Sequence, residues 1–230
     1  MRAIAINIGA NTNEPGFRGP VFPDGTFEYI PIPESKPTVE SVPTYGDLAP
    51  NLRTEIPGSL FETPVHLDPE FSEYPFCERY SYGDEHGVKA APLSELSAGD
   101  YLFFYATLTV SQPADWLPPE WGAFLIGHFR LASDPLVPTD GATITDDFAN
   151  NAHTKRDPVD ARVLVAGDPE QSRLYDRARP LSTPEGGVDA NTIVTNHSAD
   201  SGRGPWWRRP LRFDAAGTER LLDLTACTQP

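Results

Sequence analysis

The stretch "DYLFFYATL" (100–108), followed beyond a loop by "WGAFLIGHFRLAS" (121–133), decides the fold. Both are runs of mainly apolar residues, and such runs are typical of strands that are buried on both faces. The intervening "SQPADWLPPE" (111–120) is short enough to join two neighbouring antiparallel strands. The sequence therefore predicts a central β-hairpin.

Other segments predict elements around this hairpin. "AIAINIGA" (3–10) and "ARVLVAGD" (161–168) are short apolar runs that predict buried strands. "TFEYIPIP" (26–33) alternates, but its prolines cannot donate to a ladder and confine it to a sheet edge. "QSRLYDRARPL" (171–181) predicts a short helix, and the leucines of "AAGTERLLDLTAC" (215–227) predict an amphipathic one.

These elements add up to a β-dominated α+β fold with few short helices and long ordered loops. The chain of 230 residues contains 25 prolines, which interrupt nearly every other candidate helix. We expect one domain, which is made of four parts: core strands within 3–33 and 92–214, an ordered proline-rich excursion over 34–75, and the helix at 215–227. The sequence has no glycine-rich strand–helix unit, P-loop, "GxSxG" or "HExxH" motif, so the common enzyme classes that carry them are excluded.

The formal net charge is −15 and the sequence pI is about 4.6, with lysine only at Lys36, Lys89 and Lys155. We interpret this composition as the acidic surface of a halophilic protein; the alternative is self-repulsion that keeps anionic partners away. High internal salt would screen the field over a few ångströms, so a nucleic-acid ligand is not excluded.

The sequence predicts no metal and no cofactor. The two cysteines, Cys77 and Cys227, form no CxxC motif, and the five histidines are scattered without a carboxylate at facial-triad spacing. The first ten residues lack a signal peptide, and no stretch approaches the roughly 18 apolar residues that span a bilayer. We therefore expect a cytoplasmic protein without a membrane partner.

The first candidate site lies in the rigid, proline-rich segment 11–33. Asn11, Arg18, Asp24 and Glu28 are close together in it, and a stiff backbone holds polar groups in place at little entropic cost. The alternative is that Asp24 belongs to a simple turn at "FPDGT", where aspartate and glycine are the residues the geometry requires.

A second candidate lies in "RYSYGDEHG" (79–87). Tyr80, Tyr82, Asp84 and His86 alternate, so on an extended segment they share one face that could stack a base and bond its edge. The alternative is that these residues form a surface turn.

Two further loops offer cationic and polar groups. In "NNAHTKRD" (150–157), His153 offers an imidazole and Lys155 a cation suited to phosphate, although a solvated loop is an equal alternative. Ser172 and Arg173 would stand at the N-terminus of the predicted helix and bind an anion there. Helix capping and charge pairing are the alternative explanation.

The ordered motifs "NTNEPGFRGPVFPDGTFEYIPIPE", "YSYGD", "AGDYLFFYATL", "IGHFRL", "NAH" and "GDPEQSRLYDRARPLS" together resemble the family called nucleotide modification associated domain 3. The resemblance runs from about residue 3 to about residue 214. It implies a role linked to modified bases in DNA, alongside other DNA-modification or restriction proteins. The hairpin alone is similar to the core hairpin of PUA-like (EVE and ASCH) barrels, which implies a PUA-like barrel-type core with Tyr105 in a base pocket.

Three functions remain open at this stage. The first is binding of a modified or flipped base or nucleotide in an aromatic- and arginine-lined pocket. The second is an enzyme, a transferase or hydrolase acting on such a base or nucleotide, with Asp24 and His153 as acid and base. The third is a non-catalytic interaction module that uses residues 31–75.

Overall fold

The computed structural model describes residues 1–138 and 144–226. Contacts group the chain into two compact units, each built from separate segments. Unit 1 comprises Met1–Ile30, Asp100–His128 and Tyr175–Pro230, and unit 2 comprises Pro31–Gly99 and Phe129–Leu174. The single domain over 1–230 remains a prediction.

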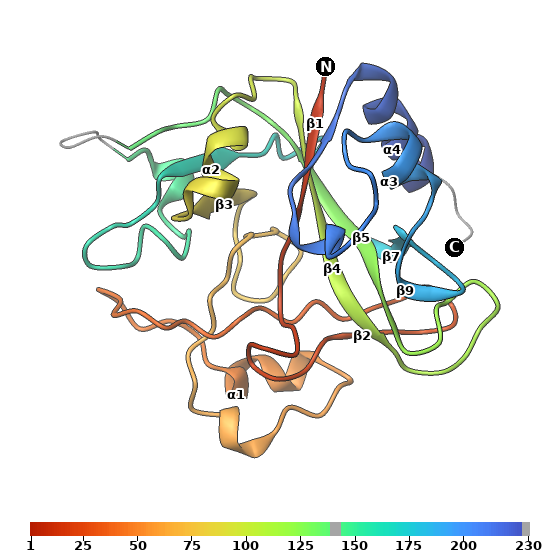
Figure 1. Cartoon of the computed structure of the whole chain (residues 1–230). Coiled ribbons are helices and arrows are strands. Elements are labelled where there is room, and N and C mark those ends of the chain that lie inside the picture. The colour runs from red at the N-terminus through yellow and green to blue at the C-terminus, as the bar shows by residue number, and fades with distance from the viewer. Residues whose placement is uncertain (139–143, 227–230) are drawn as a thin grey trace. The chain divides into compact units, whose positions relative to one another are not determined.

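Unit 1 is organised by a sheet with the strand order β10-β1-β4-β5-β7 (Figure 1). Its strands are β1 (Ala3–Asn7), β2 (Pro20–Val21), β4 (Tyr101–Val110), β5 (Trp121–Arg130), β7 (Arg173–Pro180) and β10 (Leu211–Phe213). β1 runs parallel to β4 and antiparallel to β10, and β2 pairs with the far end of β4. The path is open, and the described residues form no closed barrel.

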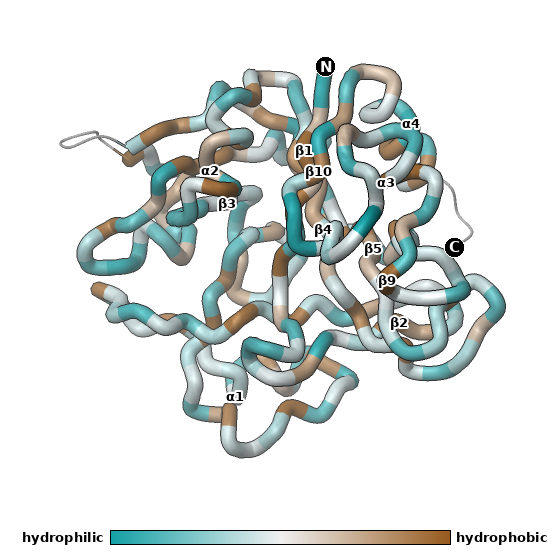
Figure 2. Tube along the Cα trace, viewed as in Figure 1, coloured by the Kyte–Doolittle hydropathy of each residue, from teal (hydrophilic) through white to brown (hydrophobic). Residues whose placement is uncertain are grey.

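The predicted central hairpin is confirmed. β4 and β5 are neighbours, and the Val110 N–H donates to the Glu120 carbonyl oxygen at 2.8 Å where the connecting loop closes. Phe103 and Tyr105 on one face of β4 and Phe104 on the other are all fully buried. Because both faces are covered, the strand has no polar alternation. Hydrophobic residues, brown in Figure 2, follow β1 and its neighbours.

The face of the sheet that carries Phe103 and Tyr105 is covered by the C-terminal part of unit 1. This part contains β8 (Ser182–Thr183), β9 (Gly186–Ala190), α3 (Thr192–His197), the 3₁₀ helix η4 (Trp206–Arg208) and α4 (Ala215–Ala226). Trp206 and Leu221 pack into the same core cluster as the two β4 rings. The predicted C-terminal helix is therefore confirmed up to Ala226, and Cys227 lies outside the described residues.

Two local predictions were wrong. Residues 171–181 were expected to form a helix, but β7 occupies this segment because it pairs with β5, and ladder bonds outweigh a weak helical preference. Residues 26–33 form no regular strand; only the isolated bridges Val21↔Phe27 and Pro33↔Val65 occur. The prolines of this segment lack the N–H groups that a continuing ladder needs.

Unit 2 contains short elements connected by long loops. They are α1 (Tyr45–Leu48), the 3₁₀ helices η1 (Ala49–Asn51), η2 (Gly58–Leu60) and η3 (Asp146–Phe148), strand β3 (Ser81–Asp84), helix α2 (Gly87–Leu93) and strand β6 (Val163–Ala166). β3 and β6 form an antiparallel pair. The predicted excursion over 34–75 is anchored by Tyr45, which is fully buried and donates its hydroxyl to the Pro31 carbonyl oxygen at 2.7 Å.

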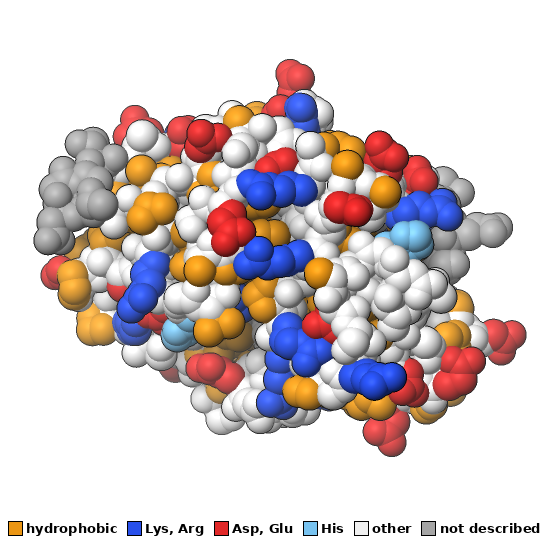
Figure 3. Space-filling view, turned by 45° about the horizontal axis from the view of Figure 1, so that its top comes forward, with side chains coloured by type: hydrophobic (Ala, Val, Ile, Leu, Met, Phe, Trp, Pro, Cys, Tyr) orange, Lys and Arg blue, Asp and Glu red, His pale blue; other side chains and the backbone are white. Residues whose placement is uncertain are grey.

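Among the helices in the described ranges, none has the length and apolar character needed to cross a membrane. Figure 3 shows acidic side chains spread over the visible face and interspersed with basic ones, rather than gathered into one patch.

Candidate functional site

Three buried side chains of unit 2 converge: His66, Asp68 and His153. Their nitrogen and oxygen ligand atoms all lie within 4.8 Å of one another, and each residue is at most 7% exposed. His66 and Asp68 follow the Pro33↔Val65 bridge on an extended segment, which the His66 N–H holds by donating to the Ile32 carbonyl oxygen at 2.9 Å.

The ring of His66 is oriented by Glu34. Its Nδ1 lies 2.6 Å from Glu34 Oε2, and the Glu34 side chain is 2% exposed. Burial alone would raise the pKa of Glu34, but hydrogen bonds from His66 and Arg156 outweigh it and lower the pKa to about 2. Because the carboxylate is ionised and can only accept, Nδ1 of His66 is the donor of this hydrogen bond.

The ring of His153 is held in the same manner by Asp160. Its Nδ1 lies 2.8 Å from Asp160 Oδ1, while its Nε2 faces Asp68 Oδ2 at 3.8 Å. The two imidazoles meet edge to face, with ring centroids 4.8 Å apart. Burial and the neighbouring His66 lower the pKa of His153 to about 4, against the opposing hydrogen bond to Asp160. The ring is therefore neutral at pH 7.

Asp68 is fixed through its other oxygen. Oδ1 accepts from the Gly83 N–H at 3.0 Å and from Asn151 Nδ2 at 2.8 Å. Burial raises the pKa of Asp68 well above its usual range. Position 83 requires glycine for the close approach, because a Cβ there would lie 2.7 Å from His153 Cδ2.

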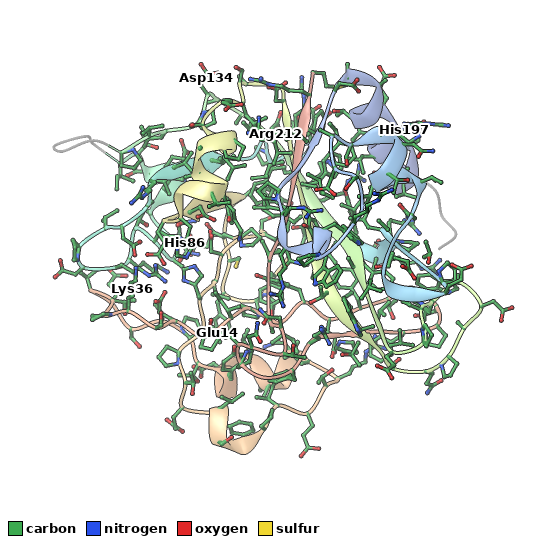
Figure 4. The ribbon with its side chains drawn as sticks, in the orientation of Figure 1. Glu14, Lys36, His86, Asp134, His197 and Arg212 are labelled. Carbon is green, nitrogen blue, oxygen red and sulfur yellow. The ribbon has the colours of Figure 1, made fainter. Side chains whose placement is uncertain are left out.

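Arg156 ties the two orienting carboxylates together. Its Nη2 lies 2.9 Å from Glu34 Oε1 and its Nη1 lies 2.8 Å from Asp160 Oδ2, and its side chain is 5% exposed. Lys36, 43% exposed, donates to Asp160 at 2.8 Å and also pairs with Glu85. Lys36 is labelled in Figure 4. Asp160 and the exposed Lys36 therefore connect the buried cluster to the surface of unit 2.

A hydrogen-bond chain joins the cluster to a cleft of about 540 Å³ in the same unit, which is lined by Arg79 and Tyr80 among others. Glu70 accepts from the Arg79 N–H at 3.2 Å and from Ser81 Oγ at 2.7 Å, and Ser81 Oγ in turn accepts from Asn151 Nδ2 at 3.1 Å. Since Asn151 also donates to Asp68, fully buried polar groups link the cleft wall to the cluster.

Of the predicted site residues in unit 2, His153 is a member of the cluster, and two others lie beside it. Tyr82 is buried and donates its hydroxyl to Asp84 Oδ2 at 2.6 Å, and the charge of Asp84 acts on Asp68. Lys155 forms a hydrogen bond to Asn150.

Ser172 and Arg173 do not stand at a helix N-terminus, because the expected helix does not form. Ser172 is buried, and its Oγ accepts from the Arg130 N–H at 3.2 Å. Arg173 is exposed at the start of β7. The anion site that was argued from a helix end has therefore lost its structural basis.

The remaining predicted residues belong to unit 1. Asp24 is exposed, and its Oδ1 accepts from the Thr26 N–H at 3.0 Å and from the Thr26 hydroxyl at 2.7 Å, which is the geometry of the turn alternative. Asn11 Oδ1 likewise accepts from the Asn13 N–H at 2.9 Å within its own turn. Glu28 is 8% exposed.

Arg18 and Tyr105 have different environments in unit 1. The Arg18 guanidinium stacks 4.5 Å from the ring centre of the half-buried Trp121, and its Nε donates to Thr107 Oγ1 at 3.3 Å. Burial lowers the pKa of Arg18. Tyr105 is fully buried and donates its hydroxyl to the Arg209 carbonyl oxygen at 2.7 Å, and burial raises its pKa.

Sequence reasoning missed most of the cluster. The "HLD" at 66–68 was the available signal, since residues two apart on an extended segment point to the same side. Its partners are far away in the sequence: Arg156 meets Glu34 across 122 positions. Without that pairing, His66 and His153 were two scattered histidines.

The fold and the cluster define a strand-rich α+β protein with a buried histidine–carboxylate site. The model of the family described as nucleotide modification associated domain 3 matches residues 2–223 of the chain, so the protein belongs to this family. Comparison with the curated proteins and with the solved structures yields no match.

Proposed function

We propose that the protein is an enzyme of nucleotide modification whose chemistry takes place at His66, Asp68 and His153 of unit 2. The observation that carries the proposal is the buried pair of imidazoles, each with Nδ1 bonded to a carboxylate, beside a third buried carboxylate. Buried groups with strongly shifted pKa values are costly to stability and concentrate at functional sites. A purely structural ion network would be complete with Glu34, Arg156 and Asp160 alone.

His153 is a group to which we assign the chemistry. Since its Nδ1–H is engaged by Asp160, its reactive atom is Nε2, which faces Asp68. Asp24, the acid that the sequence paired with His153, lies in unit 1 and is engaged in a turn with Thr26. The proposal therefore pairs His153 with Asp68 instead.

Family membership supports a nucleotide or a modified base as the substrate. The cleft of about 540 Å³ in unit 2 is within the range of small-molecule sites. It offers the Tyr80 ring for stacking and the Arg79 guanidinium for phosphate. We assign base binding to this cleft.

A second candidate function is a base reader in unit 1. It is supported by the Arg18 guanidinium over the ring of Trp121, an arrangement suited to stacking a flipped base. In this function, the buried Tyr105 would support the pocket wall from behind. The reader binds and does not turn over its ligand.

Mass spectrometry of nucleosides separates the two functions. The purified protein is incubated with nucleotides and with DNA that contains modified bases, and products are compared with those of His153→Gln and of the matched control His197→Gln in α3. The enzyme predicts a product that the wild type and the control form and His153→Gln does not. Equal amounts of product from the wild type and both variants would refute the enzyme function. Binding without turnover that is lost in Arg18→Ala would establish the reader instead.

A further inference from the structure

We infer that His66, Asp68 and His153 bind one divalent first-row transition-metal ion, through the two Nε2 atoms and a carboxylate oxygen of Asp68. The inference deepens the proposed function and rests on it for the role of the ion, which is to serve the chemistry of the same site. Binding of the ion itself is measured without any substrate.

The separations of the ligand atoms fit an ion. A metal about 2.1 Å from each ligand holds its ligands roughly 3–4 Å apart. His153 Nε2 and Asp68 Oδ2 are already 3.8 Å apart, and the largest separation in the set is within 4.8 Å. Closing around the ion therefore needs a movement of about 1 Å, which small side-chain rotations supply.

Each of the three ligands is oriented from behind, as metal ligands are. Metal-ligating histidines generally donate their other ring N–H to a carboxylate or carbonyl, which fixes the tautomer. Here Glu34 does so for His66 and Asp160 does so for His153. The second oxygen of Asp68 is held by two donors, one of which is the Gly83 N–H.

The charge around the site suits a cation. Arg156 lies 3.2 Å from both Nδ1 atoms, and therefore behind the rings rather than on the Nε2 side. Counted with Asp68 ionised, as a carboxylate that ligates a metal is, the surrounding charged groups are five carboxylates and three cationic side chains, which leaves an excess of two formal negative charges. They are Glu34, Asp68, Asp84, Glu85 and Asp160, against Lys36, Lys89 and Arg156.

The donor set selects the class of ion. Two imidazoles and one carboxylate suit zinc, iron(II) and related ions, whereas magnesium and calcium prefer all-oxygen sites. Three protein ligands leave positions open for water or substrate, which is the pattern of catalytic rather than structural metal sites.

The test uses the full chain, stripped with EDTA and then dialysed against Zn²⁺, against Fe²⁺ without oxygen, or against Mg²⁺ alone. Metal content per chain is measured after gel filtration, and Co²⁺ titration with visible absorption reports the ligand geometry. We expect one Zn²⁺ or Fe²⁺ per chain and no retained Mg²⁺. No retained ion, or retention of Mg²⁺ alone, overturns the inference.

Variants test the ligands. Asp68→Asn keeps an acceptor for Gly83 and Asn151 but loses the charge, so we expect the affinity for Zn²⁺ to fall at least 100-fold. Asp160→Asn, which weakens the support of the His153 ring and also removes the ion pairs with Lys36 and Arg156, should lower it about 10–100-fold. His197→Gln should leave it unchanged. Circular dichroism checks that each variant is folded. Unchanged affinity in a folded Asp68→Asn protein, or loss in His197→Gln, overturns the site.

The proposed metal site and the proposed catalysis can be refuted independently of each other. If the ion binds and is lost in Asp68→Asn, but no nucleotide or DNA substrate is turned over, the metal site stands and the proposed enzyme falls. If the EDTA-stripped protein turns over substrate at the wild-type rate in the continued presence of chelator, the catalysis stands and the role of the ion falls.

Discussion

Replacing Arg156 by methionine tests the centre of the unit 2 cluster. The side chain is 5% exposed and makes hydrogen bonds to Glu34 through Nε and Nη2 and to Asp160 through Nη1. Methionine fills much of the same volume but carries no charge. Two carboxylates then lose a cationic partner. Asp160 keeps its pair with Lys36, whereas Glu34 stays buried with His66 beside it.

The expected loss is large. Removing one partner of a buried ion pair costs about 3–5 kcal/mol, because the remaining charge is uncompensated. Because all three nitrogens of the guanidinium bond to carboxylates, we expect Arg156→Met to lower the free energy of unfolding by about 4 kcal/mol. Adding Glu34→Gln removes the stranded charge, so the double variant should lose about 2 kcal/mol less than the sum of the single variants.

Urea unfolding at pH 7 with EDTA present measures the change. Far-ultraviolet circular dichroism follows the whole chain, whereas tryptophan fluorescence follows unit 1, whose segments hold all 4 tryptophans. At a slope of about 2–3 kcal/mol per molar urea, 4 kcal/mol moves the midpoint down by roughly 1–2 M. The signal from unit 2 should move most.

The matched control is Arg79→Met, which removes a 45% exposed arginine from its pair with Asp147 in the same unit. Such surface pairs contribute about 0–1 kcal/mol, so its midpoint should hardly change. Equal shifts for Arg79→Met and Arg156→Met, or additive losses in the Glu34→Gln/Arg156→Met double variant, would refute the reasoning.

Four further expectations follow from the charges and close contacts. The folded pKa of Glu34, about 2, is below its unfolded value, so the stabilisation by this carboxylate is complete above about pH 4.5 and is lost as the pH falls towards 2. With EDTA present, Glu34→Gln should therefore make the free energy of unfolding depend less on pH in that window. An unchanged pH dependence contradicts this expectation. Raising KCl from about 0.1 to 2 M should raise the melting temperature, since it screens the net charge of −15; a fall would argue against self-repulsion. Burial and Glu70 raise the pKa of the Cys77 thiol to about 12. In the Cys227→Ser variant, where Cys77 is the remaining thiol, alkylation at pH 8 should therefore be about 1,000-fold slower than for a free thiol. A rate near that of glutathione contradicts this expectation. Gly187→Ala should cost about 1–3 kcal/mol in thermal unfolding, because its Cβ would collide with the Trp121 carbonyl oxygen; a neutral effect would show that β9 shifts freely.

Local signals were reliable where they coincide with burial. The apolar runs at 100–108 and 121–133 predict β4 and β5 because residues buried on both faces leave a continuous pattern. The C-terminal helix was predicted for a similar reason, since Leu221 packs into the core. The segment 171–181 was mistaken for a helix because its many arginines and its weak periodicity suit either structure; pairing with β5 decides it.

The sequence by itself determined the strand-rich class, the central hairpin, the ordered proline-rich loops and, through its motifs, the family. The site was decided only by the tertiary structure. His66 and Asp68 are 85 or more positions from His153, and the carboxylates that orient the rings come from segments on either side of these residues. Hydrophobic periodicity is local, so it records which elements form. The placing of five polar side chains around one buried point depends on long-range contacts, and no local pattern carries that information.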